Sequence, residues 1–439
     1  MNATIPQVAQ AMQTVLTTVA ATAAHETKFV QRESKMTGPL FAQTLTFGWL
    51  ANPQASLEEL TQAAATLGVA ISPQGLDARF TEEAAHFLQQ VLQAAVQQLL
   101  AADPVAIPLL QRFNGVYLQD GSTIVLPDGL AAEWQGCGGN SAGTTAALKV
   151  QVGWELTTGA LQGPWLQHGR ASDRSSPLQI MAPLAGALRL ADLGYYDLGV
   201  LAAWAAGGGY WLTRLRAGSC LWAENGQRLD LARFLAAQAG DEVDIPILLG
   251  KAQRLPGRLV ARRAPPDVAA QRRRKLKAEA RKKGRMVNRE RLALADWTIF
   301  LTNAPATLLA LAEVLVLARV RWQIELLFKL WKDHGRIDEW RSQKPWRILC
   351  EVYAKLLAML VQHWLFLVSN WACPARSLRK AAQTVQKHAL HLASAFGCRE
   401  QLEAGITVIQ RCLSFGCRLN RRKGNPNTYQ LLLAAGGLA

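Results

Sequence analysis

The sequence predicts an α/β protein with helical regions at both ends. Runs of alternating apolar residues, typical of strands, lie in the middle of the chain, whereas residues 1–105 and 371–439 have helical periodicity. Half of the 439 residues are hydrophobic, so a sizeable core is expected and disorder is excluded. The length corresponds to roughly two to four domains.

Positive charge is concentrated in one internal segment. The formal net charge is +16, and residues 251–291 hold 16 of the Lys and Arg residues against three acidic residues. Such an excess indicates a polyanionic partner, either nucleic acid or an anionic membrane surface. A solvated linker or helix face could carry the same run, RRRKLKAEARKKGR at 272–285. Its position between two strand-like segments favours contact with a phosphate backbone.

The N-terminal region contains a predicted pair of helices. Ser56 is a good N-cap, Glu59 completes a capping box, and Gly68 ends the first helix. Helical periodicity then resumes over residues 71–100. Helix, glycine turn and helix is the outline of a helix-turn-helix, although other helical hairpins share it. We expect residues 1–105 to form a helical domain that binds DNA ends.

Several strand-like segments follow in the centre of the chain. Residues 147–156 and 160–169, separated by a Thr-Thr-Gly turn, predict a hairpin. A helical pattern begins at Ala306 and runs to about Trp340. The other strands are expected at residues 113–127, 184–197, 208–216 and 297–303.

Three acidic residues stand out in this central region. Asp120 and Asp192 are each followed closely by a glycine where a strand is expected to end, and Glu325 lies on the helix. Carboxylates at strand ends can meet at one edge of a sheet. Three converging carboxylates repel one another unless a divalent cation is present, and hard oxygen ligands suit Mg²⁺. Taken singly, each aspartate is also typical of an ordinary turn.

The helix around Glu325, RWQIELLFKLWK, is apolar apart from one charged stripe. At about 100° per residue, its charged side chains fall within about 80° of one another. Nearly all remaining positions are apolar, which predicts a buried helix with a single charged window. A ladder of intrahelical ion pairs would explain the same charges, but a narrow window on an apolar helix favours a functional site. The window consists of Arg321, Glu325, Lys329 and Lys332.

This pattern resembles the bacterial insertion-sequence transposases of the DDE class, specifically the group with a Y-x2-R-x3-E-x6-K signature. Arg321, Glu325 and Lys332 match the R-x3-E-x6-K portion without a gap, and Ala318 stands at the tyrosine position. The resemblance covers roughly residues 105–370.

The resemblance implies a ribonuclease H-like catalytic core interrupted by a β-rich insertion domain. Asp120 and Asp192 match the first two acids of the family, and the 133-residue interval from Asp192 to Glu325 accommodates the insertion. The implied domains are a DNA-end-binding domain at 1–105, a catalytic core at 106–216 and 297–370, a basic β-rich insertion at 217–296, and a helical region that could pair two subunits at 371–439.

The resemblance also implies an activity and its requirements. Members of this group cleave DNA at the ends of the element and join it to target DNA through a hairpin intermediate. Asp120, Asp192 and Glu325 would be catalytic and would hold two Mg²⁺ ions, for which Mn²⁺ could substitute. The partners would be double-stranded DNA, as inverted-repeat ends and as target, and a second subunit in a homodimeric synaptic complex.

Basic and aromatic residues would contact this DNA. Arg321 and Lys332 would bind phosphates, and Arg214 would contact DNA near the hairpin. Trp297, which lies 28 residues before Glu325, would stack on an extruded base. Trp297 could equally be a core residue, and Arg214 a solvated strand end. The basic segment that would follow the flanking DNA is centred on Arg272, Arg273, Arg274 and Lys275.

The sequence indicates a cytoplasmic protein, and the resemblance implies a bacterial protein that associates with the nucleoid. The seven cysteines form no CxxC pair, which suits free thiols, and the N-terminus lacks the pattern of a signal peptide. The longest apolar run, residues 354–368, is shorter than the roughly 20 residues of a membrane span. It therefore predicts a core helix, and no membrane partner is expected.

Two other functions are compatible with these features. A catalytically decayed transposase that acts as a DNA-binding repressor would share the basic segment and the helix pair, but it would have no need of the three acids. A structure-specific nuclease of the ribonuclease H fold would keep the acids and would lack strand transfer.

Overall fold

The computed structural model describes residues 3–32, 34–138, 145–371, 373, 375–420 and 424–435. The chain divides into two compact units, which are described in turn. The helix-rich unit comprises Met1–Ile107, Asp120–Ser172 and Gln323–Tyr429, and the sheet unit comprises Pro108–Gln119, Asp173–Trp322 and Gln430–Ala439. Of the predicted C-terminal region 371–439, residues 372, 374, 421–423 and 436–439 lie outside the described residues.

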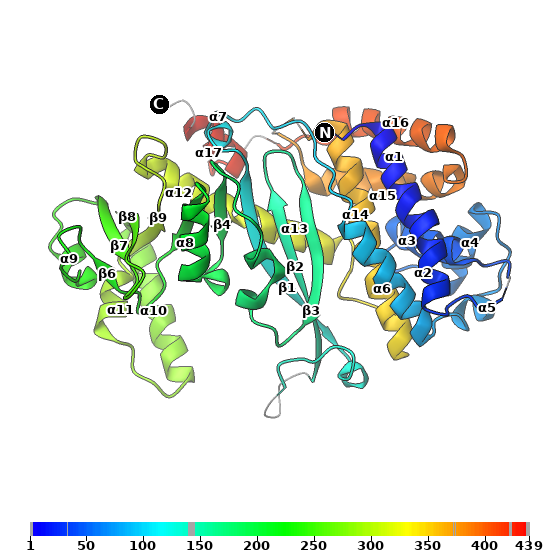
Figure 1. The fold of residues 1–439 in the computed structure, drawn as a ribbon, viewed down its shortest axis with the longest axis horizontal. Helices are drawn as coiled ribbons and strands as arrows, with labels where there is room; N and C mark the ends of the chain where they lie inside the picture. Colours follow the sequence, from blue (N-terminus) through cyan, green and yellow to red (C-terminus); the bar gives the residue numbers. More distant parts are fainter. Residues whose placement is uncertain are drawn as a thin grey trace. The chain divides into compact units, whose positions relative to one another are not determined.

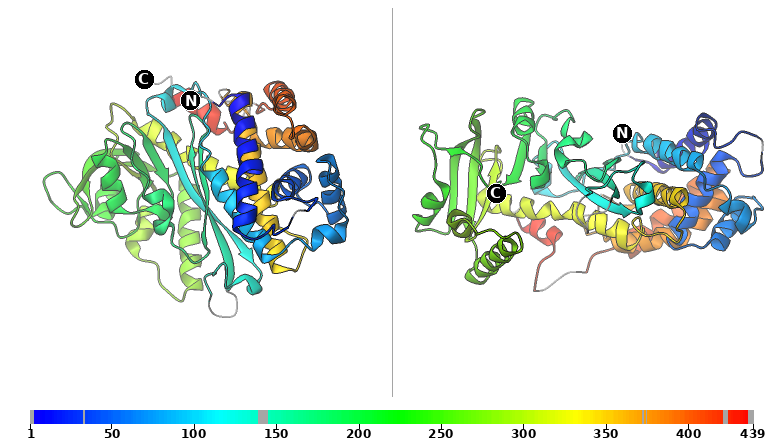
Figure 2. Two further views of the ribbon diagram at one scale, coloured as in Figure 1. Left: turned by 45° about the vertical axis from the view of Figure 1, so that its right-hand side comes forward. Right: turned by 90° about the horizontal axis from the view of Figure 1, so that it is seen from below.

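Helices from both ends of the chain pack together in the helix-rich unit, as the blue and orange ribbons show (Figures 1 and 2). The long helix α14 (Pro345–Asn370) packs against α3, α6 and α16. The other helices are α1 (Ile5–Gln13), a π-helical turn (Thr14–Val19), α2 (Ala20–Glu26), α3 (Gly38–Ala51), α4 (Leu57–Thr66), α5 (Pro73–Asp77), α6 (Glu82–Val96), α15 (Leu378–Ala395) and α16 (Arg399–Gly416).

The first predicted helix of the N-terminal pair is confirmed. Ser56 caps α4, Glu59 completes the capping box, and Gly68 follows with a φ of +80°, which favours glycine. The expectation of continuous helix over residues 71–100 is wrong, because α5 and α6 are separate helices. The hydroxyl of Thr81 accepts a hydrogen bond from the backbone N–H of Ala84, so a new helix begins there.

Helix α14 confirms the predicted core helix. Within the described part of the chain, Pro345–Ser369 is long and apolar enough to cross a membrane, and 94% of its apolar window is buried inside the protein. A buried core helix of a soluble protein has these properties. Its charged residues are paired: Lys355 lies 2.8 Å from Glu351, and both side chains are only 2% exposed.

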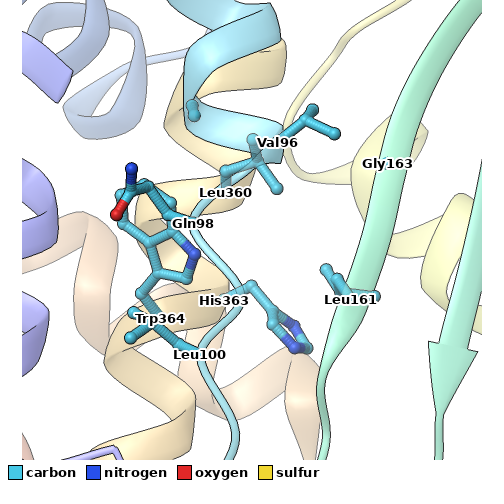
Figure 3. Close-up of a pocket in the computed structure, with 9 residues that line it drawn as sticks. Val96, Gln98, Leu100, Leu161, Gly163, Leu360, His363 and Trp364 are labelled. Carbon is cyan, nitrogen blue, oxygen red and sulfur yellow. The ribbon is translucent and has the colours of Figure 1, made fainter.

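A small cavity lies between α14, α6 and β3 (Figure 3). Leu360 and Trp364 line it together with His363, whose Nε2 lies 2.7 Å from the carbonyl oxygen of Gly159. Burial lowers the pKa of His363 to about 4, although this hydrogen bond opposes the shift. The imidazole is therefore neutral at pH 7, and His363 acts as a structural residue of the core.

The helix-rich unit also contains the predicted hairpin. β2 (Ala146–Glu155) pairs with β3 (Leu161–His168) in antiparallel register. The carboxylate of Glu155 accepts hydrogen bonds from the backbone N–H groups of Thr157 and Thr158 at 2.9 and 2.7 Å, which stabilises the turn. The strand order in this unit is β3-β2-β1, and β1 (Val116–Leu126) contributes its residues from Asp120 onward.

The sheet unit has the strand order β1-β4-β5-β9-β8-β7-β6. Strands β1, β4 and β5 run parallel, and the remaining pairs are antiparallel. α8 (Leu198–Ala206) connects β4 to β5, as a parallel crossover requires. The strands are β4 (Leu188–Ala191), β5 (Tyr210–Arg214), β6 (Leu221–Trp222), β7 (Glu242–Leu249), β8 (Leu255–Arg263) and β9 (Trp297–Thr302).

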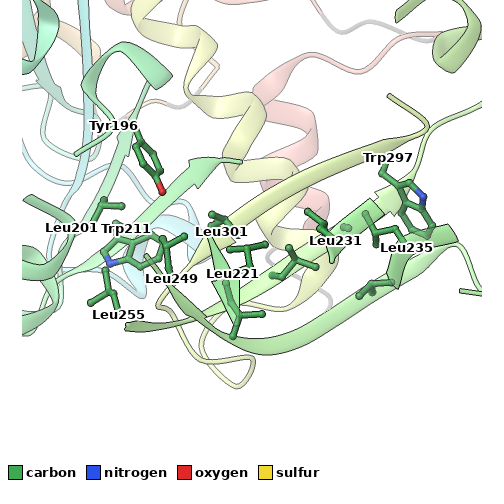
Figure 4. Close-up of a cluster of buried hydrophobic side chains, with 14 of the residues drawn as sticks. Tyr196, Leu201, Trp211, Leu221, Leu231, Leu235, Leu249, Leu255, Trp297 and Leu301 are labelled. Carbon is green, nitrogen blue, oxygen red and sulfur yellow. The ribbon is translucent and has the colours of Figure 1, made fainter. Parts of the chain in front are cut away.

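Residues 217–296, predicted as a β-rich insertion, continue this sheet from β9. β8 pairs with the whole of β9, from Arg263↔Trp297 to Arg258↔Thr302. One hydrophobic cluster contains buried side chains from β5, β7, β8 and β9, among them Trp211, Leu255 and Leu301 (Figure 4). The segment also contains the helices α9 (Leu231–Ala236), α10 (Pro266–Lys282) and α11 (Arg289–Leu294).

The remaining elements include two that carry predicted site residues. α12 (Leu311–Val320) lies in the sheet unit, and α13 (Trp322–Asp333) follows it directly. All seven cysteines lie in the described residues and are free thiols, as predicted. Short helices are α7 (Pro108–Gln111), α17 (Thr428–Ala435) and the 3₁₀ turns Asp128–Leu130, Asp173–Ser175, Pro177–Gln179 and Leu193–Tyr195.

Candidate active site

The first predicted acid, Asp120, follows the last paired residue of the β1–β4 ladder. The parallel register runs from Val116↔Leu188 to Gln119↔Ala191. The strand predicted at 113–127 is confirmed as β1, but Asp120 lies within it and not at its end, because β1 continues to Leu126. What ends at this point is the pairing with the much shorter β4. Oδ1 of Asp120 accepts a hydrogen bond from the backbone N–H of Gly121 at 2.8 Å.

The second predicted acid, Asp192, lies where the sequence places it, directly after a strand. β4 ends at Ala191, and Asp192 begins the 3₁₀ turn Leu193–Tyr195 with an extended backbone, at φ −72° and ψ 166°. Its side chain is exposed. Asp192 follows Ala191 as Asp120 follows Gln119, so each acid stands one residue beyond the same register pair.

The third predicted acid, Glu325, lies in the first turn of α13 and is partly buried. Lys332, on the same helix, donates a hydrogen bond to the backbone carbonyl of Thr123 at 3.1 Å and lies 3.5 Å from a carboxylate oxygen of Asp338. Thr123 belongs to β1, three residues after Asp120. Within the helix-rich unit, α13 is therefore tied to the strand that carries the first acid.

The charged window of this helix differs from the prediction in two respects. Arg321 lies outside α13, as the C-cap of α12. The helix is also not buried on all its apolar sides, because Trp322 is 53% exposed and Leu326 is 42% exposed. One side of α13 packs inward, and the other side meets solvent. The buried apolar residues are Ile324, Leu327, Phe328, Leu330 and Trp331.

The predicted base-stacking residue, Trp297, is a core residue in this structure. Its side chain is 5% exposed and belongs to the hydrophobic cluster of the sheet unit (Figure 4). The guanidinium of Arg263 lies over the ring, 4.5 Å from its centroid. This is the core role that the sequence left open.

Sequence reasoning missed the exposed Trp322. This aromatic ring directly follows Arg321 and lies on the helix that carries Glu325. The signal was present: at about 100° per residue, Trp322 falls about 60° from Glu325, on the same side as the exposed Lys329. Its apolar ring instead predicts a place on the core face of the helix.

Arg214 ends β5 and is exposed, as a DNA contact requires. The pKa of Arg272 is lowered by burial and further by the charge of Arg214. Two of the predicted DNA-binding cations therefore lie close enough to repel each other within the sheet unit.

The basic run on α10 separates into bonded and exposed residues. Arg272 donates hydrogen bonds to the carbonyl oxygen of Trp297 at 3.1 Å and to Oγ1 of Thr298 at 3.0 Å. Arg273 pairs with Asp296. By contrast, the next two side chains of the run, Arg274 and Lys275, are exposed. The first two arginines dock α10 on the sheet, and the next two cations are available to solvent.

The predicted residues are divided between the two units. In the described parts of the chain, no group of three or more His, Cys, Asp or Glu side chains within one site is arranged to hold a metal ion. The chemistry of the donor set nevertheless fits Mg²⁺, since all three acids offer carboxylate oxygens. The helix-rich unit holds Asp120, Glu325 and Lys332, and the sheet unit holds Asp192, Arg214, Arg272, Arg273, Arg274, Lys275, Trp297 and Arg321.

Comparison with known proteins gives one consistent family. Residues 111–361 match the transposase DDE domain. The transposase for insertion sequence element IS231F of Bacillus thuringiensis subsp. israelensis is 27% identical over 361 residues, which cover 77% of this chain and 75% of that protein. The transposase for insertion sequence element IS1151 of Clostridium perfringens is 24% identical over 372 residues, covering 79% and 77%.

The matched region contains both aspartates, the glutamate and the helix on which the glutamate lies. More than half of the chain is covered by the family match. The chain therefore belongs to the transposase DDE domain family and is a DNA transposase of the bacterial insertion-sequence type.

Proposed function

We propose that the protein catalyses Mg²⁺-dependent cleavage at the ends of its insertion sequence and joins those ends to target DNA through a hairpin intermediate. The observation that carries this proposal is the parallel β1–β4 register, in which the last pair, Gln119↔Ala191, is followed on each strand by an aspartate. Adjacent parallel strands present their carboxyl ends at one sheet edge, where ligand sites form. The catalytic domain would be the ribonuclease H-like core, with residues 217–296 as its insertion.

Asp120, Asp192 and Glu325 would hold the metal ions. When bound, two Mg²⁺ ions, or Mn²⁺ in their place, would activate the attacking oxygen and stabilise the leaving 3′-oxygen. The backbone N–H of Gly121 donates a hydrogen bond to Oδ1 of Asp120 and so restrains this carboxylate.

The cations beside the acids would position the DNA strand. Arg321 and Lys332 would bind phosphates, and Lys332 would exchange its contact with the Thr123 carbonyl for a charged oxygen, which is a stronger acceptor. Arg214, whose charge acts on Arg272, would contact DNA near the hairpin.

Hairpin formation needs a sharply bent strand and a partner for an extruded base. Stacking on Trp297 would require the guanidinium of Arg263 to leave the ring. The exposed Trp322 offers an aromatic face without that rearrangement. Ala318, in place of the signature tyrosine, removes one contact to the bent strand, so hairpin formation should be weaker than nicking.

The proposal is tested with the full-length protein and a DNA fragment that carries the inverted repeats flanking its gene. Products resolved on denaturing gels should show nicks at the repeat ends with Mg²⁺ or Mn²⁺ and none with EDTA. Binding without metal-dependent cleavage would indicate a decayed transposase acting as a repressor. Cleavage without joining to target DNA would indicate a structure-specific nuclease.

The exposed half of the basic run gives a prediction of its own. Replacing both Arg274 and Lys275 with Ala should weaken DNA binding by about tenfold and reduce the slope of log K against log salt by about 2, because two phosphate contacts are lost. Filter binding at several salt concentrations measures both quantities.

The matched control replaces Arg272 and Arg273 with Ala, which removes the same charge. These side chains hold α10 on β9 and Asp296, so replacing them should lower the melting temperature. Replacing the exposed Arg274 and Lys275 should leave the melting temperature unchanged. An equal loss of stability in both double variants would contradict the separation of the basic run into bonded and exposed residues.

The partners would be double-stranded DNA, as terminal repeats and as target, and a second subunit that the C-terminal helices α15 and α16 could engage in a synaptic complex. Residues 1–105 would bind the DNA ends. Like other transposases, the protein is expected to be soluble and cytoplasmic, and its DNA partner would associate it with the nucleoid.

A further inference from the structure

A buried arginine links the two strands that precede the aspartates. Arg189, on β4, is 3% exposed. Its Nε donates a hydrogen bond to Oε1 of Gln119 at 2.8 Å, and Nη2 donates to Oε1 of Gln179 at 2.6 Å. Burial lowers the pKa of Arg189 to about 10, so the guanidinium remains charged at neutral pH.

Both glutamines that accept from Arg189 also donate hydrogen bonds to backbone carbonyl oxygens. The amide of Gln119 donates to the carbonyl oxygen of Leu178 at 3.1 Å, and the amide of Gln179 donates to that of Tyr195 at 2.9 Å. Gln119 is the residue before Asp120, and Tyr195 closes the 3₁₀ turn that Asp192 begins. One guanidinium therefore restrains the chain next to the first acid and just after the second.

We propose that Arg189, together with Gln119 and Gln179, positions Asp120 and Asp192 for metal binding. Side chains alternate along a strand, so the side chains of Gln119 and Asp120 lie on opposite faces of the sheet. Arg189 acts through the glutamines and the backbone, from the face opposite the carboxylates, and it contacts no reacting atom. This inference rests on the proposed function, because it assigns these aspartates to the metal ions.

Stability alone does not account for this arrangement. A buried guanidinium loses its hydration, its hydrogen bonds go to neutral amide oxygens, and the attraction of Asp197 only partly offsets the effect of burial on its pKa. An apolar side chain of similar volume would fill the same space without this loss of hydration. What the arginine adds is direction: its planar fork fixes two acceptors at once, which an apolar side chain does not do.

The sharpest test is Gln179→Glu in the full-length protein. The carboxylate keeps the shape of the side chain and still accepts from Arg189, so the fold should be retained. It has no N–H to donate to Tyr195, so the turn after Asp192 loses its restraint. We expect the single-turnover nicking rate to fall by about 10- to 100-fold and the Mg²⁺ concentration at half-maximal rate to rise. DNA affinity measured in EDTA should stay within about twofold.

The control is Thr302→Val, which also removes a buried donor to a backbone carbonyl in the sheet unit, the bond from Oγ1 of Thr302 to Trp211 at 2.7 Å. It should lower the melting temperature and leave the nicking rate and its Mg²⁺ dependence unchanged. If Thr302→Val also changes the Mg²⁺ dependence, the effect of Gln179→Glu is explained by a general loss of stability, and the inference is overturned.

Arg189→Met supplies a second variant that removes the whole link. If Gln179→Glu and Arg189→Met both fold and both nick at the rate and Mg²⁺ dependence of the unmodified protein, the positioning role is wrong while the proposed function stands. The proposed function itself fails if the unmodified protein shows no Mg²⁺-dependent nicking. That result would overturn this inference as well.

Discussion

Glu325→Gln should abolish Mg²⁺-dependent nicking, with a loss of about 10³-fold or more, while DNA binding is retained. A neutral amide is a poor ligand for a hard dication, and a metal ion supplies several kcal/mol of transition-state stabilisation, each 1.36 kcal/mol being tenfold in rate. The measurement is single-turnover cleavage of repeat-end DNA on denaturing gels, with the affinity determined separately in EDTA.

Glu339→Gln is the matched control, because it makes the same chemical change at an exposed glutamate that pairs with Arg336 at 2.6 Å. It should nick at the rate of the unmodified protein, since a surface ion pair contributes little to stability. If Glu325→Gln cleaves as fast as this control, the assignment of Glu325 as a metal ligand is wrong.

Glu351→Leu should destabilise the protein by about 3–5 kcal/mol at pH 7, because it leaves the ammonium group of Lys355 buried without its carboxylate. Both side chains of the pair are 2% exposed. Lys355 also donates to the carbonyl oxygens of Arg336 and Glu339, at 3.1 and 2.7 Å, which do not replace a negative charge. Urea denaturation followed by circular dichroism gives the free energy of unfolding.

The pH dependence and a double variant make this prediction specific. Burial already lowers the pKa of Lys355, against the attraction of Glu351. Without the glutamate, the folded-state pKa falls further below the unfolded value, so stability is lost as pH falls below the unfolded pKa. The destabilisation should therefore be smaller at pH 10 than at pH 7. Glu351→Leu combined with Lys355→Met should restore most of the stability; a double variant as unstable as the single would contradict this account.

Local elements of this fold were largely predictable from the sequence. The capping box at Ser56 and Glu59, the β2–β3 hairpin and the core helix α14 were all expected and are confirmed. Each depends on signals within a few residues of one another, such as a side-chain cap or an apolar period. The break between α5 and α6 was missed, although Thr81 is an ordinary N-cap, because the apolar periodicity on either side outweighed it.

The site residues were predicted as candidates by spacing and by resemblance, and their environments were not predictable. Neighbouring positions of one basic run have different roles: Arg273 pairs with Asp296, and Arg274 is exposed. Trp297 and Trp322 are the same residue type in apolar segments, yet the side chain of Trp297 is 5% exposed and that of Trp322 is 53% exposed. Which side of an element is covered depends on chain segments far away in the sequence.

By itself, the sequence determined the family and several local elements, namely α4, the β2–β3 hairpin and α14, because these follow from residue identity and short-range periodicity. It supplied the three acids as candidates. Only the tertiary structure decided the register of β1 with β4, which places Asp120 and Asp192 one residue beyond the same pair, and the link from Arg189 to both strand ends. The register and the bond from Arg189 to Gln119 join residues about 70 positions apart along the chain, and no local pattern encodes them.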